Sequence, residues 1–455
     1  MLRKVTAQLL VWKDSQYRKP LVLQGARQVG KTYAVLEFAR MEYDNIAYIN
    51  FEFDRAGAAI FENSLDPKEI IPKIEIFTKQ TVTKGRTLIF LDEIQKCPPA
   101  LTMLKYFDEF APEYHIIVAG SLLGVAVSRE GFSYPVGKVN RLTLFPMDFE
   151  EYLIAVGKSD LVARIMKCFN TNEAMETIYH NSLLEYYRQY LVVGGMPDCV
   201  AKFIETGDYT LIRATQKAIL EDYLDDMSKY NNKNEIKKTR LTYDSVTVQL
   251  SKKNTRFQYK LIKSGGRAAE FENAIEWLTL SGIVTRIHVL DTVKKPLDNY
   301  KNIDSFKIFM SDMGLLSAKS NVSANDILYS SSEINDFKGG MTENYVCSQL
   351  VCRGHECYTW FSEGEAEVDF VIQREGKIIP IEVKSADNSK AKSLSIYMGR
   401  FKPEYAIKIS SNNFGFSNGI KDDPALCCFL YMICVGVFFR QALPDPKYQI
   451  SPYMS

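Results

Sequence analysis

The sequence has few residues that bind zinc or build a disulfide framework. Its nine cysteines include no C-x-x-C pair, and its four histidines are scattered along the chain. These spacings argue against a zinc site and against structural disulfides, and they suit a reducing compartment. The N-terminus shows no signal-peptide pattern. We therefore expect a cytoplasmic protein.

Long hydrophobic runs and an excess of one charge are also missing. The longest apolar run, residues 425–439, is shorter than the ~20 residues that a membrane-spanning helix needs. It predicts a buried strand or helix, and no membrane partner. The net charge of +1 means that any surface for nucleic acid must be local. At 455 residues and 46% hydrophobic content, the chain is long enough for about three globular domains.

One motif near the N-terminus carries a specific chemistry. A short apolar run, residues 21–23, predicts a buried strand, and residues 33–40 predict a helix. Between them lies a segment that fits the phosphate-binding pattern G-x-x-x-x-G-K-[ST]. It consists of Gly25, Ala26, Arg27, Gln28, Val29, Gly30, Lys31 and Thr32.

The residue types of this P-loop suit ATP and Mg²⁺. Gly25 and Gly30 let the backbone turn its N–H groups toward phosphate oxygens, and the helix N-terminus adds a favourable dipole. Lys31 is placed to reach the β- and γ-phosphates, and the Thr32 hydroxyl to bind Mg²⁺. The motif therefore predicts an ATP site that spans residues 25–32.

A second apolar run, residues 87–91, ends in Asp92 and Glu93. This is the pattern of a Walker B strand, in which Asp92 holds Mg²⁺ and Glu93 orients and deprotonates the attacking water. A further apolar strand, residues 115–120, ends at Ser121. In a parallel sheet these strand ends meet at one edge, where the ligand lies. Ser121 is either a sensor of the γ-phosphate or the N-cap of a helix.

At this point the sequence resembles a known family. The segments GARQVGKT, LIFLDEIQ, VAGSLLG and LTLFPMDFEEYL look like those of prokaryotic AAA-type ATPases whose C-terminal half is the region called DUF4143. The resemblance continues through YLVVGGMPDCV, FENAIEWLTLSGIV, KIFMSDMGLL, TENYV, EVDF and IEVK, and covers roughly residues 1–418. It implies an α/β fold: a P-loop ATPase core with a parallel sheet, a winged-helix-like middle, and a C-terminal domain similar to PD-(D/E)xK restriction endonucleases.

The resemblance also implies the domain boundaries. They are an ATPase core over 1–155, a helical domain over 156–235, a winged-helix-like domain over 236–318 and a restriction-endonuclease-like domain over 336–420. The tail, 421–455, does not look like the family.

Gly137-Lys138 stands where the family often carries Gly-Arg, and Arg129 and Arg141 are the nearby alternatives for an arginine finger. Because such a finger usually comes from a neighbouring copy, self-association and the monomer both remain open.

A local basic run lies in the middle of the chain. The helix predicted over 268–280 and the strands over 283–290 and 306–310 match a winged helix. Before them, residues 251–267 carry six basic residues and no acidic one. This run, residues 252–267, predicts contact with the phosphates of double-stranded DNA; the alternatives are a solvated face or contact with neighbouring domains. Its members are Lys252, Lys253, Arg256, Lys260, Lys263 and Arg267.

The C-terminal part offers a second candidate site. Glu343 lies on a predicted helix over 342–351, Asp369 on a strand over 367–372, and Glu382 and Lys384 on a strand over 377–384. Glu382 and Lys384 are two apart and share one face of their strand. By the resemblance, Glu343, Asp369 and Glu382 hold Mg²⁺ for DNA cleavage and Lys384 polarises water or phosphate. The alternative is a surface salt pair of Glu382 with Lys384.

Together these motifs predict an ATP hydrolase that couples its nucleotide state to a DNA-associated, nuclease-like domain. The alternative is a nucleotide-gated binding switch whose nuclease-like domain is inactive and recognises nucleic acid or protein. Glu93 separates the two, because a switch needs no general base.

Overall fold

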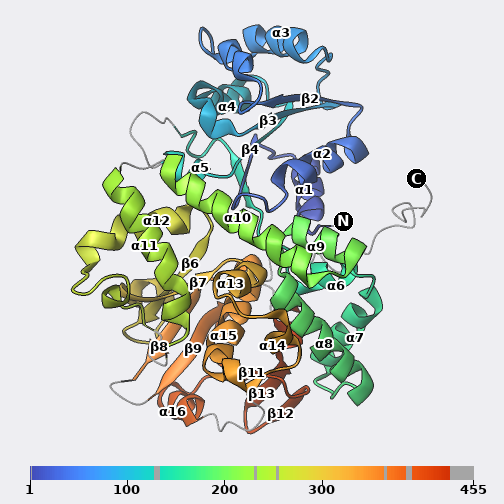
Figure 1. Cartoon of the computed structure of the whole chain (residues 1–455). Helices are drawn as coiled ribbons and strands as arrows, with labels where there is room; N and C mark the ends of the chain where they lie inside the picture. The colour runs from blue at the N-terminus through green and yellow to red at the C-terminus, as the bar shows by residue number, and fades with distance from the viewer. Residues whose placement is uncertain are drawn as a thin grey trace.

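The computed structural model describes residues 1, 3–127, 134–229, 233–252, 256–362, 366–385 and 392–430. These residues build two β-sheets, one from the N-terminal part and one from the C-terminal part, with helices around and between them (Figure 1). Within the described ranges, no helix combines the length and the apolar character needed to cross a membrane.

The N-terminal sheet has five parallel strands in the order β2-β3-β4-β1-β5. Every residue of β3 and β4 is buried, as expected for the central strands of a sheet with both faces covered. The parallel α/β sheet predicted from the sequence is thereby confirmed. The strands are β1 (Leu21–Gln24), β2 (Asn45–Asn50), β3 (Thr87–Asp92), β4 (His115–Gly120) and β5 (Asn140–Thr143).

Helices cover both faces of this sheet. On β1, Leu21 and Leu23 pack into one hydrophobic core and Val22 into another, because successive strand residues point to opposite faces. The helix predicted after the P-loop is confirmed as α2. The surrounding elements are α1 (Val5–Asp14), α2 (Lys31–Glu42), η1 (Arg55–Phe61), α3 (Pro67–Thr78), η2 (Ile94–Lys96), α4 (Pro98–Phe110) and α5 (Leu123–Val127).

A run of helices follows, as the sequence predicts for residues 148–230. The segment Gly194-Gly195-Met196-Pro197 predicts a break in this run, and the structure confirms it. Helix α8 ends at Val193, Gly194 has a φ of 77°, and α9 begins with Pro197, whose ring suits the first turn of a helix. The helices are α6 (Phe149–Ala155), α7 (Ser159–Thr171), α8 (Thr177–Val193), α9 (Pro197–Thr206) and α10 (Tyr209–Lys229).

The second sheet is mixed and has eight strands in the order β12-β13-β11-β10-β9-β8-β6-β7. Strand β10 pairs antiparallel with β9 and parallel with β11. The strands are β6 (Val284–Leu290), β7 (Lys301–Met310), β8 (Cys357–Phe361), β9 (Glu367–Arg374), β10 (Lys377–Val383), β11 (Ala406–Ser410), β12 (Gly415–Ser417) and β13 (Ile420–Pro424).

The predicted hairpin of the middle region is part of this second sheet. Strands β6 and β7 pair antiparallel, and β6 also pairs in parallel with β8, with His288 opposite Tyr358. The sheet therefore continues across the boundaries expected at residues 318 and 336. The division into winged-helix-like and restriction-endonuclease-like domains stays a prediction.

Residues 317–338 are rich in Ser and Asn, a composition that predicts a connection without helices. This prediction is wrong, because the segment contains helices. Its serines cap them: Ser323 Oγ accepts a hydrogen bond from the N–H of Asp326 at 3.1 Å, and Ser331 Oγ one from Glu333 at 3.2 Å. The elements that accompany the second sheet are α11 (Lys233–Leu250), η3 (Tyr259–Leu261), α12 (Ala268–Leu280), η4 (Leu297–Tyr300), α13 (Met313–Lys319), α14 (Ala324–Leu328), η5 (Ser332–Ile334), α15 (Asn335–Cys352) and α16 (Lys392–Phe401).

The start of the tail belongs to the fold. After β13 the chain forms η6 (Ala425–Leu430), in which Cys427 and Cys428 are fully buried. This segment contacts α7 and α15, so it covers part of the core. The remainder of the tail, 431–455, lies outside the described residues.

Helices α11 and α15 approach each other closely at one glycine. A Cβ atom added to Gly340 of α15 would lie 2.2 Å from the carbonyl oxygen of Leu250, at the end of α11. A Cβ added to the preceding Gly339 would meet nothing within 4 Å. Gly340 is therefore required by packing, and Gly339 is not.

We expect Gly340→Ala to lower the free energy of unfolding by about 1–3 kcal/mol, the usual cost of an overpacked contact. Gly339→Ala is the matched control on the same helix. It should be neutral or stabilise by up to about 1 kcal/mol, because alanine favours a helix more than glycine does. Urea unfolding of both variants measures the difference. Equal stability of the two would show that α11 and α15 can separate without cost.

Candidate functional site

The P-loop turns sharply between β1 and α2. Its backbone has positive φ at three positions, 147° at Gly25, 65° at Gln28 and 91° at Gly30. A Cβ atom on Gly25 would lie 2.1 Å from the carbonyl oxygen of Leu144, so only glycine fits there. A loop of this kind, leading into a helix N-terminus, is a concave arrangement of backbone N–H groups that binds anions.

Lys31 is the first residue of α2 and is buried. Its Nζ donates hydrogen bonds to the carbonyl oxygens of Gly25 at 2.9 Å and Ala26 at 2.8 Å. Burial lowers the pKa of Lys31 to about 8, although Glu93 and Asp92 nearby raise it. Lys31 makes no ion pair with any described residue, so its charge is held by neutral carbonyl groups.

Thr32 and Asp92 meet beside Lys31. The Oγ1 of Thr32 donates to Oδ2 of Asp92 at 2.6 Å, and the Tyr48 hydroxyl lies 3.4 Å from the same oxygen. Asp92 is the last residue of β3, and Thr32 is in the first turn of α2. A hydroxyl and a carboxylate are the hard oxygen ligands that Mg²⁺ prefers, so this pair fits the ion.

Glu93 follows Asp92 in a left-handed backbone conformation, with a φ of 53°. Gln95 donates from Nε2 to Oε2 of Glu93 at 2.5 Å. Burial raises the pKa of Glu93, and the hydrogen bond from Gln95 opposes this rise. No motif in the sequence singles out Gln95. Ser121 is buried at the end of β4, at the same edge of the sheet, and its role stays a prediction.

Helix α10 contacts the P-loop directly. Arg27 forms an ion pair with Asp226 at 2.8 Å, Gln28 donates to Asp222 at 2.5 Å, and the Tyr223 hydroxyl donates to the carbonyl of Arg27 at 3.3 Å. In Figure 1, α10 runs between the two sheets. The motif leaves the residue types at Arg27 and Gln28 unspecified, so nothing in it indicated these contacts.

One candidate arginine finger lies outside the described residues, and the other has no described contact with this cluster. Arg129 falls outside the described residues. Arg141 is on the edge strand β5, with its guanidinium 4.3 Å from the centre of the Tyr134 ring. Lys138 pairs with Glu109 at 2.9 Å. A finger function of Arg129 or Arg141 stays a prediction.

The C-terminal site contains two residues that the sequence analysis missed. Lys307 of β7 is nearly fully buried, and its Nζ lies 3.0 Å from Glu343, 2.5 Å from Glu367 and 3.8 Å from Asp369. The carboxylate oxygens of these three acids lie within 4.8 Å of one another. Glu367 could have been found, because it is two residues before Asp369 on β9 and shares its face. Lys307 comes from a distant strand.

The expected members Asp369, Glu382 and Lys384 lie on the neighbouring strands β9 and β10 or next to them. Asp369 accepts a hydrogen bond from the N–H of Val383 at 2.7 Å, and Lys384 pairs with Glu382 at 2.5 Å. Burial raises the pKa of Asp369 well above its usual range, and Glu343 raises it further. Burial also raises the pKa of Glu382, against the lowering effect of Lys384.

The basic run borders this carboxylate cluster. The guanidinium of Arg256 lies 4.2 Å from the centre of the Phe361 ring, and Nζ of Lys307 lies 5.9 Å from the same ring. Phe361 pairs with Glu367 between β8 and β9. Lys252, Arg256, Lys260, Lys263 and Arg267 are exposed. Lys253 lies outside the described residues.

Ionic contacts join the N-terminal part of the chain to α15. Arg3 donates to the P-loop carbonyl of Val29 at 3.0 Å and pairs with Glu151 at 3.1 Å. Asp148, the N-cap of α6, is fully buried and pairs with Arg353 at 3.1 Å, directly after α15. Burial raises the pKa of Asp148, but Lys4 and Arg353 lower it more, to about 2.

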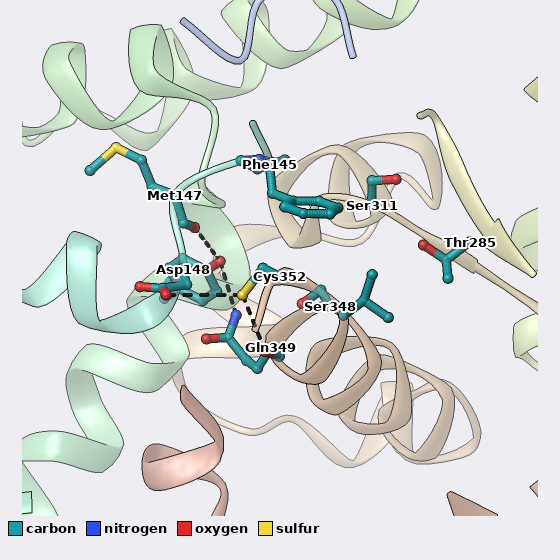
Figure 2. A pocket seen from close by; sticks show the side chains of 11 residues that line it. Phe145, Met147, Asp148, Thr285, Ser311, Ser348, Gln349 and Cys352 are labelled. Carbon is teal, nitrogen blue, oxygen red and sulfur yellow. Dashed lines mark hydrogen bonds between the residues drawn. The ribbon is translucent and has the colours of Figure 1, made fainter. Parts of the chain in front are cut away.

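A small cavity lies at this junction, lined by residues of the α6 N-terminus, α8, β6 and α15. Figure 2 shows Asp148, Gln349 and Cys352 turned toward one another beside it. The Sγ of Cys352 lies 3.9 Å from Asp148, and Gln349 donates to the Tyr190 hydroxyl at 3.4 Å. These contacts hold the end of α15 against the core.

Solved structures resemble the chain distantly. The Walker-type ATPase PABY2304 of Pyrococcus abyssi is 13% identical, with a TM-score of 0.42, and the match covers 70% of this chain and 95% of that one. The Aeropyrum pernix ORC1 protein, solved in complex with DNA, is 13% identical with a TM-score of 0.29, over 70% of this chain and 92% of that one. The function of this site therefore has to be judged from its own residues.

A curated relative is the uncharacterized protein MJ1544 of Methanocaldococcus jannaschii, which is 27% identical over 207 residues. The match covers 45% of this chain and 40% of the relative, so this chain spans less than half of its length.

Three family models match consecutive parts of the chain. They are an AAA domain over residues 17–153, a domain of unknown function (DUF8612) over 184–326, and a domain of unknown function (DUF4143) over 338–422. The AAA and DUF4143 parts of the resemblance are thereby confirmed. Residues 17–153 are a P-loop AAA-type ATPase domain, and a DUF4143 region follows in the C-terminal part of the chain.

Proposed function

We propose that the protein binds and hydrolyses ATP at the carboxyl edge of its N-terminal sheet. The observation that carries this proposal is the environment of Lys31. Lys31 lies at the N-terminus of α2, and its buried ammonium donates to two carbonyl groups of the P-loop. It has no ion pair among the described residues. A buried cation of this kind favours an anionic ligand, and a nucleotide phosphate is one.

The neighbouring residues supply what hydrolysis needs. Thr32 and Asp92 would hold Mg²⁺, which would neutralise charge on the phosphates when bound. Glu93 accepts the proton of the attacking water, and its raised pKa brings it closer to neutral pH, where a general base works best. The hydrogen bond from Gln95 orients the Glu93 carboxylate. Ser121 is the candidate sensor of the γ-phosphate.

The alternative is a nucleotide-gated switch with negligible turnover. It would use Lys31, Thr32 and Asp92 in the same way but would need no base. The position of Glu93, half-buried and directly after the Asp92 ligand, favours hydrolysis.

We expect Lys31→Ala and Glu93→Gln to separate binding from hydrolysis. Lys31→Ala should weaken ATP binding at least tenfold, since a hydrogen bond to a charged group contributes about 1.5–3 kcal/mol. Glu93→Gln should retain ATP binding and lower kcat by about 10²–10⁴-fold, because an amide cannot accept the proton. Calorimetric titration and a phosphate-release assay measure the two effects.

Glu37→Gln is the matched control for these variants. Glu37 lies on the same helix, α2, but pairs with Arg40 at the surface. It should leave both binding and turnover unchanged. Wild-type turnover in Glu93→Gln would rule out the general-base role and leave the switch as the better account.

A second candidate function is DNA binding by the basic run. The observation that favours it is the position of Arg256, which stacks on Phe361 beside the carboxylate cluster. Basic residues that contact the phosphates would bring the DNA backbone close to Glu343, Asp369 and Glu382. The predicted cleavage would also need a metal ion there. With the Lys307 ammonium among these acids, the residues as they lie do not fit a resident divalent ion.

We expect the double reversal Arg256→Glu and Lys260→Glu to weaken the binding of duplex DNA and flatten its salt dependence. Each lost phosphate contact should reduce the slope of log K against log salt by about 0.9. Fluorescence anisotropy at several salt concentrations measures this slope. Lys68→Glu with Lys79→Glu, exposed at the two ends of α3, reverses the same number of charges as a control. An unchanged slope in the first variant would exclude Arg256 and Lys260 from the interface.

A further inference from the structure

The carboxylate cluster of the second sheet already contains a cation. Lys307 reaches this cluster from β7, and on that strand Lys307 lies opposite Ile287 of β6. Its Nζ contacts Glu343 from α15 and both Glu367 and Asp369 from β9. Of the described residues, these three acids are the one group whose ligand atoms are close enough together to hold a metal ion.

We propose that Lys307 is the resident cation of this cluster and that its ammonium excludes divalent metal ions from it. An ammonium group and a metal ion would compete for the same carboxylate oxygens. Glu343, Glu367 and Asp369 cannot turn their oxygens toward both. This inference concerns the regulation of the second candidate site above, and it requires neither DNA binding nor ATP hydrolysis.

Burial makes the Lys307 contacts hard to replace. The side chain is 2% exposed. Burial alone would lower its pKa, but Glu343, Glu367 and Asp369 reverse this and hold the pKa well above its usual value. The three carboxylates therefore favour the charged form of Lys307. Removing one partner of a buried ion pair leaves an uncompensated buried charge, so a metal ion must offset that loss before it displaces the lysine.

The charges of the cluster agree with this assignment. Glu343, Glu367, Asp369 and Glu382 surround the site, and Lys307 and Lys384 supply two positive charges. Burial raises the pKa values of Asp369 and Glu382 above their usual range. Oε2 of Glu382 is buried and has no hydrogen-bond partner in the described part of the chain. It is available as a ligand if the ammonium is removed.

The test measures Mn²⁺ binding to the nucleotide-free protein. The electron paramagnetic resonance signal of the free ion reports how much Mn²⁺ is bound. We expect Lys307→Met to gain a Mn²⁺ site that is about tenfold or more tighter than any C-terminal site of the wild type, a difference of 1.4 kcal/mol or more. Adding Asp369→Asn to Lys307→Met should abolish the new site. The P-loop is intact in every variant, so its contribution cancels.

Lys301→Met is the matched control, because Lys301 lies on the same strand but pairs with Asp298 at the surface. It should bind Mn²⁺ like the wild type. If Lys307→Met does not fold, the double variant Lys307→Met with Glu367→Gln replaces it in the test, because this variant removes one charge of each sign. That variant should gain the site, and its melting temperature should rise with Mn²⁺.

Two results would overturn the proposal. One is unchanged Mn²⁺ binding in the folded Lys307 variants. The other is a wild-type Mn²⁺ site that Asp369→Asn alone removes. Because the titration contains neither ATP nor DNA, either result would leave the proposed ATP hydrolysis and DNA binding untouched.

Discussion

Lys31 and Lys307 are both buried, and the protein has to compensate a positive charge in each place. Among the described residues, Lys31 has carbonyl oxygens as its only hydrogen-bond acceptors, and its pKa falls to about 8. Lys307 lies among three carboxylates, and its pKa rises. Since an uncompensated buried charge is costly, the first site favours an anion and the second has no need of another cation. The proposed roles of the two sheets follow from this difference.

A chain of polar contacts leads from the P-loop to α15. Arg3 binds the P-loop carbonyl of Val29 and the carboxylate of Glu151. Glu151 and Asp148 form the capping box of α6, and Asp148 pairs with Arg353 at the end of α15. The same helix α15 carries Glu343 into the carboxylate cluster. These polar contacts link the P-loop backbone to the end of α15, and α10 contacts the P-loop separately.

The features that could be predicted from the sequence are those that depend on short, local motifs. Lys31, Thr32 and Asp92 belong to motifs whose spacing and flanking strands define their position, and the structure brings them together. Glu367 and Lys307 were missed for different reasons. Glu367 shares the strand face of Asp369, a local signal, whereas Lys307 depends on the pairing of β6 with β8, which no local pattern specifies. The contacts of α10 with the P-loop are long-range in the same way.

The most direct test of this account is a nuclear magnetic resonance titration of the Lys31 and Lys307 side-chain amines in the nucleotide-free protein. We predict that Lys31 loses its proton near pH 8 and that ADP shifts this transition to higher pH, because the phosphates stabilise the charged form. Lys307 should remain protonated over the whole range in which the protein is folded. Deprotonation of Lys307 before Lys31, or identical titration of both, would contradict the account.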